Sequence, residues 1–188
     1  MRKIILLFFV ITVALFNNEI GSAEGPKNYL KGKFYSSVKD HFLIATEKMR
    51  DNRFNETVII MLESDENGAW GLVINKRIGT MPIALLIDPS LNTSEEREDL
   101  FKINIPVFWG GPVDAKEIFI LHSTEYKSET TKNYGNISIS QDYTVLFDIA
   151  KNNGPKKSLV ILGYSGWGSG QLEGEIERDH WILSDIDL

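Results

Sequence analysis

His122 is the side chain in this sequence with the clearest potential for acid–base chemistry. It ends the apolar run 118–121, where a predicted strand gives way to a polar segment. Because imidazole titrates near neutral pH, His122 is a candidate general base or anion contact. Glu173 and Glu175, at the start of a predicted helix, are carboxylates that could orient it. A histidine that only forms a hydrogen bond at the rim of a sheet would occupy the same kind of position, and both possibilities stay open.

Three glycine-rich blocks, at residues 68–75, 106–113 and 162–173, set polar side chains beside the ends of predicted strands. Glycine reaches backbone conformations that other residues resist. We therefore expect the blocks to gather loops on one surface that receives a ligand or partner. The candidate ligand-binding residues are Asn75, Gly110, Gly111, His122, Gly166, Gly168 and Gln171.

A tryptophan stands beside a glycine in each block, at Trp70, Trp109 and Trp167. Filling the core explains tryptophans more often than stacking on a ligand does. Three tryptophans on one surface would favour stacking instead.

The third block contains a glycine-rich segment, 163–170, between a predicted buried strand and a predicted helix. Backbone N–H groups in such a place can bind an anion. However, the segment lacks a phosphate-loop lysine and the dinucleotide spacing, and three glutamates crowd the helix start. These carboxylates suit the helix dipole and would repel a phosphate, so turn formation is the favoured interpretation.

Several kinds of site are missing from the sequence. There is no cysteine, which excludes disulfides, cysteine nucleophiles, thiolate zinc sites and iron–sulfur clusters. His41 and His180 have no metal-ligand spacing, and Ser165 lacks the spacing of a nucleophile elbow. We therefore predict no metal and no cofactor.

Residues 1–23 have the layout of a secretory signal peptide. A basic start precedes an apolar run over 4–16, and Gly21-Ser22-Ala23 supplies the small residues that a signal peptidase recognises. The sequence thus predicts cleavage after Ala23 and a single domain over 24–188. One alternative is an uncleaved anchor, although the run is shorter than the roughly 20 apolar residues that a bilayer requires. A misassigned start upstream of a cytoplasmic protein is the other.

The chain is acidic, with 20 Lys and Arg against 26 Asp and Glu, a formal net charge of −6. Removal of Arg2, Lys3 and Glu19 with the signal leaves 18 and 25, a net charge of −7. Because neutralisation of phosphates dominates nucleic-acid binding, nucleic acid is an unlikely partner. No second apolar span follows, so we expect no membrane partner and a soluble mature protein.

The pattern along the chain predicts an α+β domain. Apolar, β-prone runs predict strands at 41–46, 57–63, 69–75, 107–109, 118–122, 137–140, 158–162 and 181–183. Helical patterns occur at 81–87, 142–152 (with Asp142 as its cap) and 171–178, while 88–102 is an exposed helix or a mobile excursion. Leu172 and Ile176 lie one turn apart and should face the core. Since strands outnumber helices and do not alternate with them, we expect a mixed or antiparallel sheet.

Six blocks in order, 42–46, 53–58, 68–76, 109–113, 119–123 and 162–176, resemble successive motifs of the YqgE/AlgH family. The resemblance extends from about residue 30 to 184. It implies a compact single α+β domain built around a barrel-like sheet with peripheral helices. It implies no reaction, because the activity of the family is unsettled, and its members are described in places as transcriptional regulators. Family members are usually cytoplasmic, whereas residues 1–23 indicate an exported or periplasmic protein.

The favoured hypothesis is a binding or regulatory protein whose glycine-rich blocks form a site for a small ligand or a protein partner. No nucleophile or metal set is visible, so the sequence favours a protein that is not an enzyme. The first alternative is a hydrolase with His122 as general base and Glu173 or Glu175 as its orienting carboxylate. The second is the transcriptional regulator of the family description, which the acidic composition and the export signal both oppose.

Overall fold

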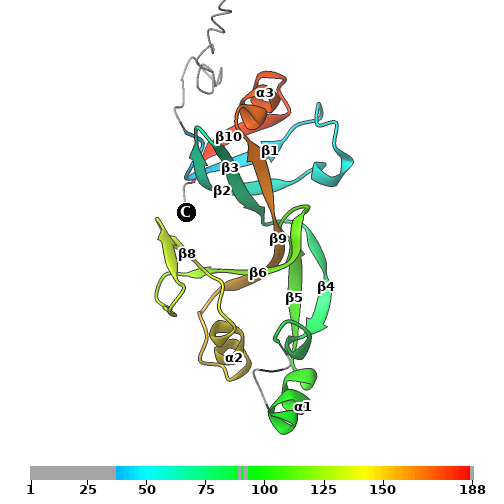
Figure 1. Cartoon of the computed structure of the whole chain (residues 1–188), viewed down its shortest axis with the longest axis vertical. Coiled ribbons are helices and arrows are strands. Elements are labelled where there is room, and N and C mark those ends of the chain that lie inside the picture. The colour runs from blue at the N-terminus through cyan, green and yellow to red at the C-terminus, as the bar shows by residue number, and fades with distance from the viewer. Residues whose placement is uncertain (1–36, 89, 91–92, 187–188) are drawn as a thin grey trace, which may run out of the picture.

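Ten strands form one curled sheet in the computed structural model, which describes residues 37–88, 90 and 93–186 (Figure 1). The predicted signal peptide therefore lies outside the described residues. The main strand order is β10-β1-β2-β3-β9-β6-β8-β7, and β5 pairs with both β4 and β9. The strands are β1 (His41–Ala45), β2 (Val58–Asp65), β3 (Gly68–Val73), β4 (Arg77–Pro82), β5 (Asn104–Trp109), β6 (Val113–Ser123), β7 (Lys132–Tyr134), β8 (Ile137–Ser140), β9 (Ser158–Gly168) and β10 (Trp181–Asp185).

The long strand β9 joins the two halves of the sheet. Its first part pairs with β6, as in Val160 opposite Ile120, and its last part pairs with β3, as in Gly166 opposite Trp70. These pairings are antiparallel, whereas β5 runs parallel to β9. Since β9 belongs to both halves, the sheet curls into a half-barrel. The predicted α+β fold with a barrel-like mixed sheet is confirmed.

The turn between β5 and β6 crosses β9 with almost no space between the backbones. A Cβ atom on Gly110 would lie 2.1 Å from the carbonyl oxygen of Gly163, and one on Gly111 would lie 2.2 Å from the carbonyl carbon of Tyr164. Gly163 itself has a φ of 70°, which favours glycine. These glycines are therefore required by the bend of the sheet.

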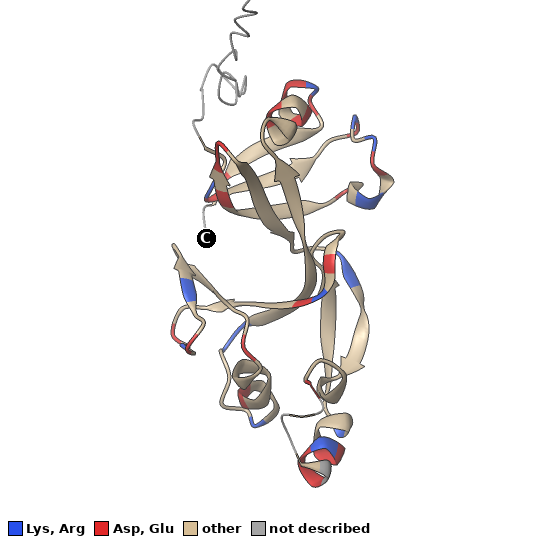
Figure 2. Cartoon of the chain, viewed as in Figure 1, with Lys and Arg blue, Asp and Glu red and all other residues tan. Residues whose placement is uncertain are grey.

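Helices cover the outer faces and ends of the sheet (Figure 1). They are α1 (Ser94–Lys102), α2 (Thr144–Ala150) and α3 (Gln171–Glu177), with short 3-10 turns η2 (Asn52–Phe54) and η3 (Ile83–Leu85). Leu172 and Ile176 of α3 are buried, as predicted. Most charged residues lie in helices and loops rather than in the centre of the sheet (Figure 2). No helix among the described residues is both long and apolar enough to cross a bilayer.

The core consists of three clusters of buried residues. One lies beneath α2 and η3, and a second beneath α3. The third, the inner cluster, fills the concave side of the half-barrel with residues from β2, β3, β6, β8 and β9; it comprises Ile60, Leu62, Leu72, Phe119, Leu121, Ile139 and Ile161. Burial of these side chains from both halves stabilises the curl, because each removes apolar surface from water.

The glycine-rich segment 163–170 differs from its prediction. It is strand up to Gly168, and only two residues separate β9 from α3. Glycine has a low strand propensity, so the local sequence indicated a loop. Pairing of β9 with β3 as far as the partners Gly168 and Gly68 stabilises the strand instead. The sequence predicted that Gly166 and Gly168 lie in a loop, and this was wrong, because both residues belong to a strand.

Three further local predictions differ from the structure. Strands β4 and β7 lie in segments that the sequence did not identify as strands. Asp142 does not cap α2, whose N-cap is Tyr143. Asp142 instead accepts hydrogen bonds from the hydroxyls of Ser128 and Thr130, at 2.5 and 2.6 Å. Burial raises the pKa of Asp142, but these hydrogen bonds outweigh burial, and its pKa is lowered.

Candidate functional site

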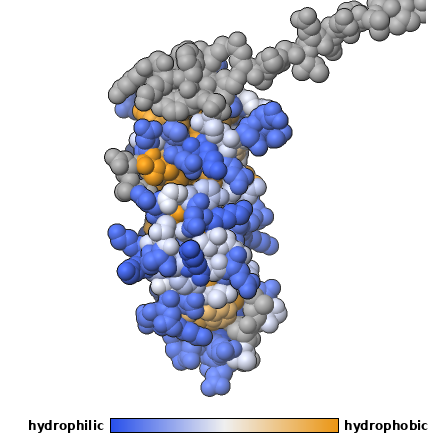
Figure 3. All heavy atoms as spheres, turned by 90° about the vertical axis from the view of Figure 1, so that its left-hand side faces the viewer, coloured by the Kyte–Doolittle hydropathy of each residue, from blue (hydrophilic) through white to orange (hydrophobic). Residues whose placement is uncertain are grey.

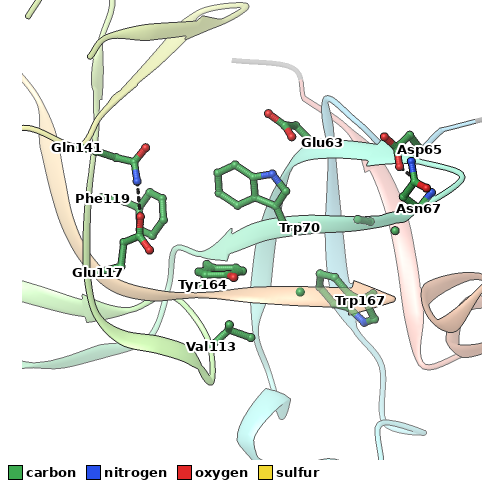
Figure 4. A pocket seen from close by; sticks show the side chains of 13 residues that line it. Glu63, Asp65, Asn67, Trp70, Val113, Glu117, Phe119, Gln141, Tyr164 and Trp167 are labelled. Carbon is green, nitrogen blue, oxygen red and sulfur yellow. Dashed lines mark hydrogen bonds between the residues drawn. The ribbon is translucent and has the colours of Figure 1, made fainter. Parts of the chain in front are cut away.

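A groove of about 560 Å³ opens at the mouth of the half-barrel, between the β2–β3 hairpin and the strands β6 and β8 (Figure 4). Mouths of barrels are common places for ligand sites, and this volume lies within the usual range of small-molecule pockets. The lining residues come from four strands, a turn and the residue after β8: Glu63, Asp65, Asn67, Gly68, Ala69, Trp70, Val113, Glu117, Phe119, Gln141, Tyr164, Gly166 and Trp167.

Three aromatic rings form one wall of the groove. The ring centroid of Trp70 lies 5.7 Å from that of Phe119 and 5.8 Å from that of Tyr164. The rings of Phe119 and Tyr164 are 6.1 Å apart and almost perpendicular. All three pack against the inner cluster, of which Phe119 is a member. The core of the half-barrel thus holds the rings in place, while Trp70 and Tyr164 stay partly accessible.

The charged side chains of the groove are all acidic. Glu63, Asp65 and Glu117 line it, and none of its lining residues is Lys, Arg or His. The amide of Gln141 donates a hydrogen bond of 2.7 Å to the carboxylate of Glu117 and fixes its position (Figure 4). Carboxylates attract a cation, and the face of a tryptophan or tyrosine ring adds a cation–π contribution. The groove is therefore suited to a positively charged group.

Gly166 leaves room beside the aromatic wall. A Cβ atom at this position would lie 3.4 Å from Cε2 of Tyr164 and 3.8 Å from Cγ2 of Val113, at ordinary van der Waals distances. Gly166 is exposed. A larger side chain here would therefore project over the wall and narrow the groove.

The side of the molecule that faces left in Figure 1 carries hydrophobic areas separated by hydrophilic residues (Figure 3). No single apolar area extends over the part of this face that the described residues form. A partner that covers it would have to offer polar or charged groups as well as apolar ones.

Comparison with known proteins identifies the family. A model of the AlgH-like family matches residues 42–188. The chain belongs to the AlgH-like family. It is 37% identical over 158 residues to a UPF0301 protein of Stutzerimonas stutzeri, with 84% of this chain and 82% of that protein covered. It is also 37% identical over 158 residues to the UPF0301 protein AlgH of Pseudomonas aeruginosa, with 80% and 78% covered. These names state no reaction and no ligand.

Two solved structures resemble this AlgH-like chain. The solution structure of AlgH from Pseudomonas aeruginosa has a TM-score of 0.65 and 36% sequence identity, covering 82% of this chain and 80% of that one. A crystal structure of a Corynebacterium diphtheriae protein has a TM-score of 0.55 and 14% identity, covering 78% and 75%. The second shows a common fold alone.

The structure of this AlgH-like chain separates His122 from Glu173 and Glu175. The His122 ring, only 3% exposed, has Nδ1 2.9 Å from the carbonyl oxygen of Ser123 and Nε2 2.9 Å from the hydroxyl of Ser140. Since a carbonyl only accepts, Nδ1 donates, and Nε2 accepts from Ser140 when the ring is neutral. The nitrogen that a general base requires is therefore already hydrogen bonded.

The carboxylate of Glu175 has a different role. Its Oε2 accepts hydrogen bonds from the indole nitrogens of Trp167, at 3.0 Å, and Trp181, at 2.7 Å. Glu173 is half-buried on the same helix, α3. His122 on β6 and Glu175 on α3 therefore form their hydrogen bonds with different neighbours, and these bonds give no support to the predicted pairing of His122 with a glutamate.

Asn75 has a structural role at the end of β3. Its side-chain oxygen accepts a hydrogen bond of 2.9 Å from the backbone nitrogen of Val58, and its amide donates one of 2.8 Å to the carbonyl oxygen of Glu56. These bonds tie the start of β2 to the end of β3. Gly110 and Gly111 are buried at the crossing with β9 and do not line the groove.

Of the predicted ligand-binding residues, only Gly166 lines the groove. Gln171 accepts a hydrogen bond from the backbone nitrogen of Gly168 and donates one to Glu175. Trp70 and Trp167 line the groove, whereas Trp109 packs against Phe54 at 5.5 Å. In the described part of the chain no three or more His, Asp or Glu residues lie close enough together to hold a metal ion.

Sequence reasoning missed the acidic residues of the groove. Glu63 and Glu117 stand in strands that the sequence identified only in part, and nothing in their local sequence connects them. The sequence did contain one signal for the aromatic wall of the groove. Tyr164 and Gly166 are two residues apart, and residues at this spacing lie on the same face of a strand.

Proposed function

We propose that this AlgH-like protein is a non-catalytic binding protein whose groove holds a lysine or arginine side chain of a partner peptide. The observation that supports this most is the combination of three carboxylates, no basic lining residue and an aromatic wall. The volume of about 560 Å³ suits one extended basic side chain with its neighbouring residues rather than a whole domain.

The rigidity of the groove supports the same proposal. Phe119 is buried in the inner cluster, and the Glu117 carboxylate is held by Gln141. Little side-chain entropy is therefore lost when a partner binds, which leaves more of the interaction energy for affinity. Among the described residues no observation favours the hydrolase. The carboxylates of the groove would repel the phosphates of DNA.

The test is a titration with short capped peptides that differ at one central position, as Lys, Arg, Gln or norleucine. Binding is followed by tryptophan fluorescence and by amide chemical shifts. We expect the Lys and Arg peptides to bind at least about tenfold more tightly than the Gln and norleucine peptides. Equal binding of all four peptides, or no shift at groove residues, contradicts the proposal.

Two pairs of variants locate the binding. The double change Glu63→Gln with Glu117→Gln should lower the affinity for the Lys peptide about tenfold. Glu98→Gln, on the exposed face of α1, should leave this affinity unchanged. Gly166→Val should block the groove, while Gly79→Val, where a Cβ meets nothing within 4 Å, is the matched control. If Glu98→Gln weakens binding as much as the double change, overall charge is responsible and the groove is not the site.

A further inference from the structure

A second pocket lies beside α3 and has the opposite character. It encloses about 280 Å³ and shares Gly166 and Trp167 with the groove. Its basic lining residues come from the segment before η2, from η2 itself and from the residues that follow α3; they are Arg50, Arg53, Arg178 and His180. Two carboxylates, those of Asp51 and Glu175, line it as well.

Both carboxylates are already hydrogen bonded. Asp51 Oδ2 accepts from Nη2 of Arg53 at 2.6 Å, and its Oδ1 accepts from Nε of Arg53 at 3.0 Å. This pairing lowers the pKa of Asp51. Glu175 is held by the indole nitrogens of Trp167 and Trp181, and by Gln171 at 3.3 Å. The acidic side chains of this pocket are thus engaged with neighbours in the protein.

Two of the arginines have no such partner. The side chains of Arg50 and Arg178 are exposed and form no hydrogen bond or ion pair with any described residue. The guanidinium of Arg178 lies back over α3, since a Cβ atom on Gly174 would be 3.2 Å from its Nη1. Arg50 and Arg178 thus line the pocket with guanidinium groups that no described residue engages in a hydrogen bond or ion pair.

His180 is the third unpaired group. It is only 8% exposed, its ring lines the pocket, and its ring nitrogens form no hydrogen bond with the described residues. His180 lines the same pocket as Arg50 and Arg178, and its imidazole is able to form a hydrogen bond with an anion bound there.

We propose that this pocket binds the phosphate group of a small phosphomonoester. Arginine forks match the geometry of phosphate oxygens and donate two parallel charge-assisted hydrogen bonds. Trp167, Phe54 and Pro112 supply an apolar wall for the carbon atoms of the ligand. The volume of about 280 Å³ admits a phosphate with a few carbon atoms. This site is separate from the proposed peptide groove, and either can fail without the other.

The experiment is an amide chemical-shift titration of the full chain with glycerol phosphate, inorganic phosphate and acetate, each at matched ionic strength. We expect glycerol phosphate to bind with a Kd on the order of 1 mM, more tightly than inorganic phosphate, and acetate to bind least. The shifted amides should lie at 49–54 and 171–180. Equal shifts with all three anions, or shifts confined to other segments, overturn the proposal. Equal affinity for glycerol phosphate and inorganic phosphate would show that the pocket binds free phosphate, and it would overturn the proposal that the ligand is a phosphomonoester.

Variants provide the second arm. The double change Arg50→Gln with Arg178→Gln should lower the affinity for glycerol phosphate at least about tenfold. Arg77→Gln removes an exposed arginine of β4 outside the pocket and should leave affinity unchanged. His180→Phe keeps a buried ring without nitrogens and should weaken binding several-fold while the protein stays folded. If Arg77→Gln weakens binding as much as the double change, the effect is one of net charge and the pocket is not the site.

Discussion

The groove and the α3 pocket meet at the same two residues, Gly166 and Trp167, yet they have opposite charge. The groove is built by strands from both halves of the sheet, and no basic residue lines it. The pocket is lined by residues 49–54, Pro112, the end of β9, and residues within and just after α3, and both its carboxylates are hydrogen bonded within the protein. The two sites lie this close because the end of β9 borders both of them, while their charged residues come from different segments of the chain.

The groove and the α3 pocket also differ in the contacts that stabilise them. The groove depends on long-range strand pairing and the inner cluster, so the half-barrel must form before the groove exists. The pocket depends in addition on the hydrogen bonds that Glu175 accepts from two buried indoles. A change in the shared frame should therefore damage both sites, and a change at Glu175 mainly the pocket.

The largest effect is expected for Gly110→Ala, which tests the shared frame. Its Cβ would lie 2.1 Å from a backbone oxygen of β9 that cannot move aside easily. The free energy of unfolding should fall by about 3 kcal/mol, and both sites should lose affinity together. Urea unfolding measures the change, with Gly79→Ala as the control. Unchanged stability of Gly110→Ala would mean that the crossing of β9 is not the support that the two sites share.

The next effect is expected for Glu175→Leu, which separates the two sites. Two indole N–H groups, on side chains 7% and 3% exposed, would lose their acceptor. We expect the free energy of unfolding to fall by about 2 kcal/mol and phosphate binding to weaken, while the Lys peptide still binds. Glu175→Gln keeps an acceptor and should restore most of the stability. Loss of peptide binding in the leucine variant would show that the sites are coupled.

A smaller effect is expected for Asp51→Asn, which frees Arg53 from its carboxylate. The pocket gains an unpaired guanidinium, so affinity for glycerol phosphate should rise about threefold, and peptide binding at the groove should not change. The same titration measures both affinities. Lower phosphate affinity would mean that Asp51 positions Arg53 for the ligand rather than competing with it.

The smallest effect concerns pH. The pKa of Asp51 is lowered in the folded protein by its hydrogen bonds with Arg53. Asp51 therefore contributes stability above its ordinary pKa of about 3.9, and this contribution is lost as the pH falls through the lower folded value. Asp51→Asn should make stability less dependent on pH in that window, as urea unfolding at about pH 5 and about pH 3 would measure. An equal loss on acidification in both proteins would assign the dependence to other carboxylates.

Elements that depend on local pattern were predicted well. The strands around 41–46 and 158–162 are continuous apolar runs, and α3 presents Leu172 and Ile176 at helical spacing. Strands β4 and β7 were missed because their stability comes from pairing with β5 and β8 rather than from their own residues. The end of β9 was missed for the same reason, since its glycines disfavour a strand until β3 pairs with them.

The candidate site was predicted less well than the fold. Asn75 and His122 stood out as polar residues beside strands, and the structure shows each of them in hydrogen bonds within the protein. A polar residue next to an apolar run identifies the end of a strand. However, a side chain that forms hydrogen bonds with the backbone has the same local sequence pattern as one that binds a ligand.

The sequence by itself determined the family, the α+β class and most of the strands, because these depend on composition and on patterns a few residues long. Only the tertiary structure decided where the sites lie. Glu63 and Trp70 pair across the β2–β3 hairpin, whereas Glu117 lies far along the chain and meets them because β9 belongs to both halves of the sheet. Their approach depends on the curl of the half-barrel, which is a property of non-local pairing and packing of the inner cluster.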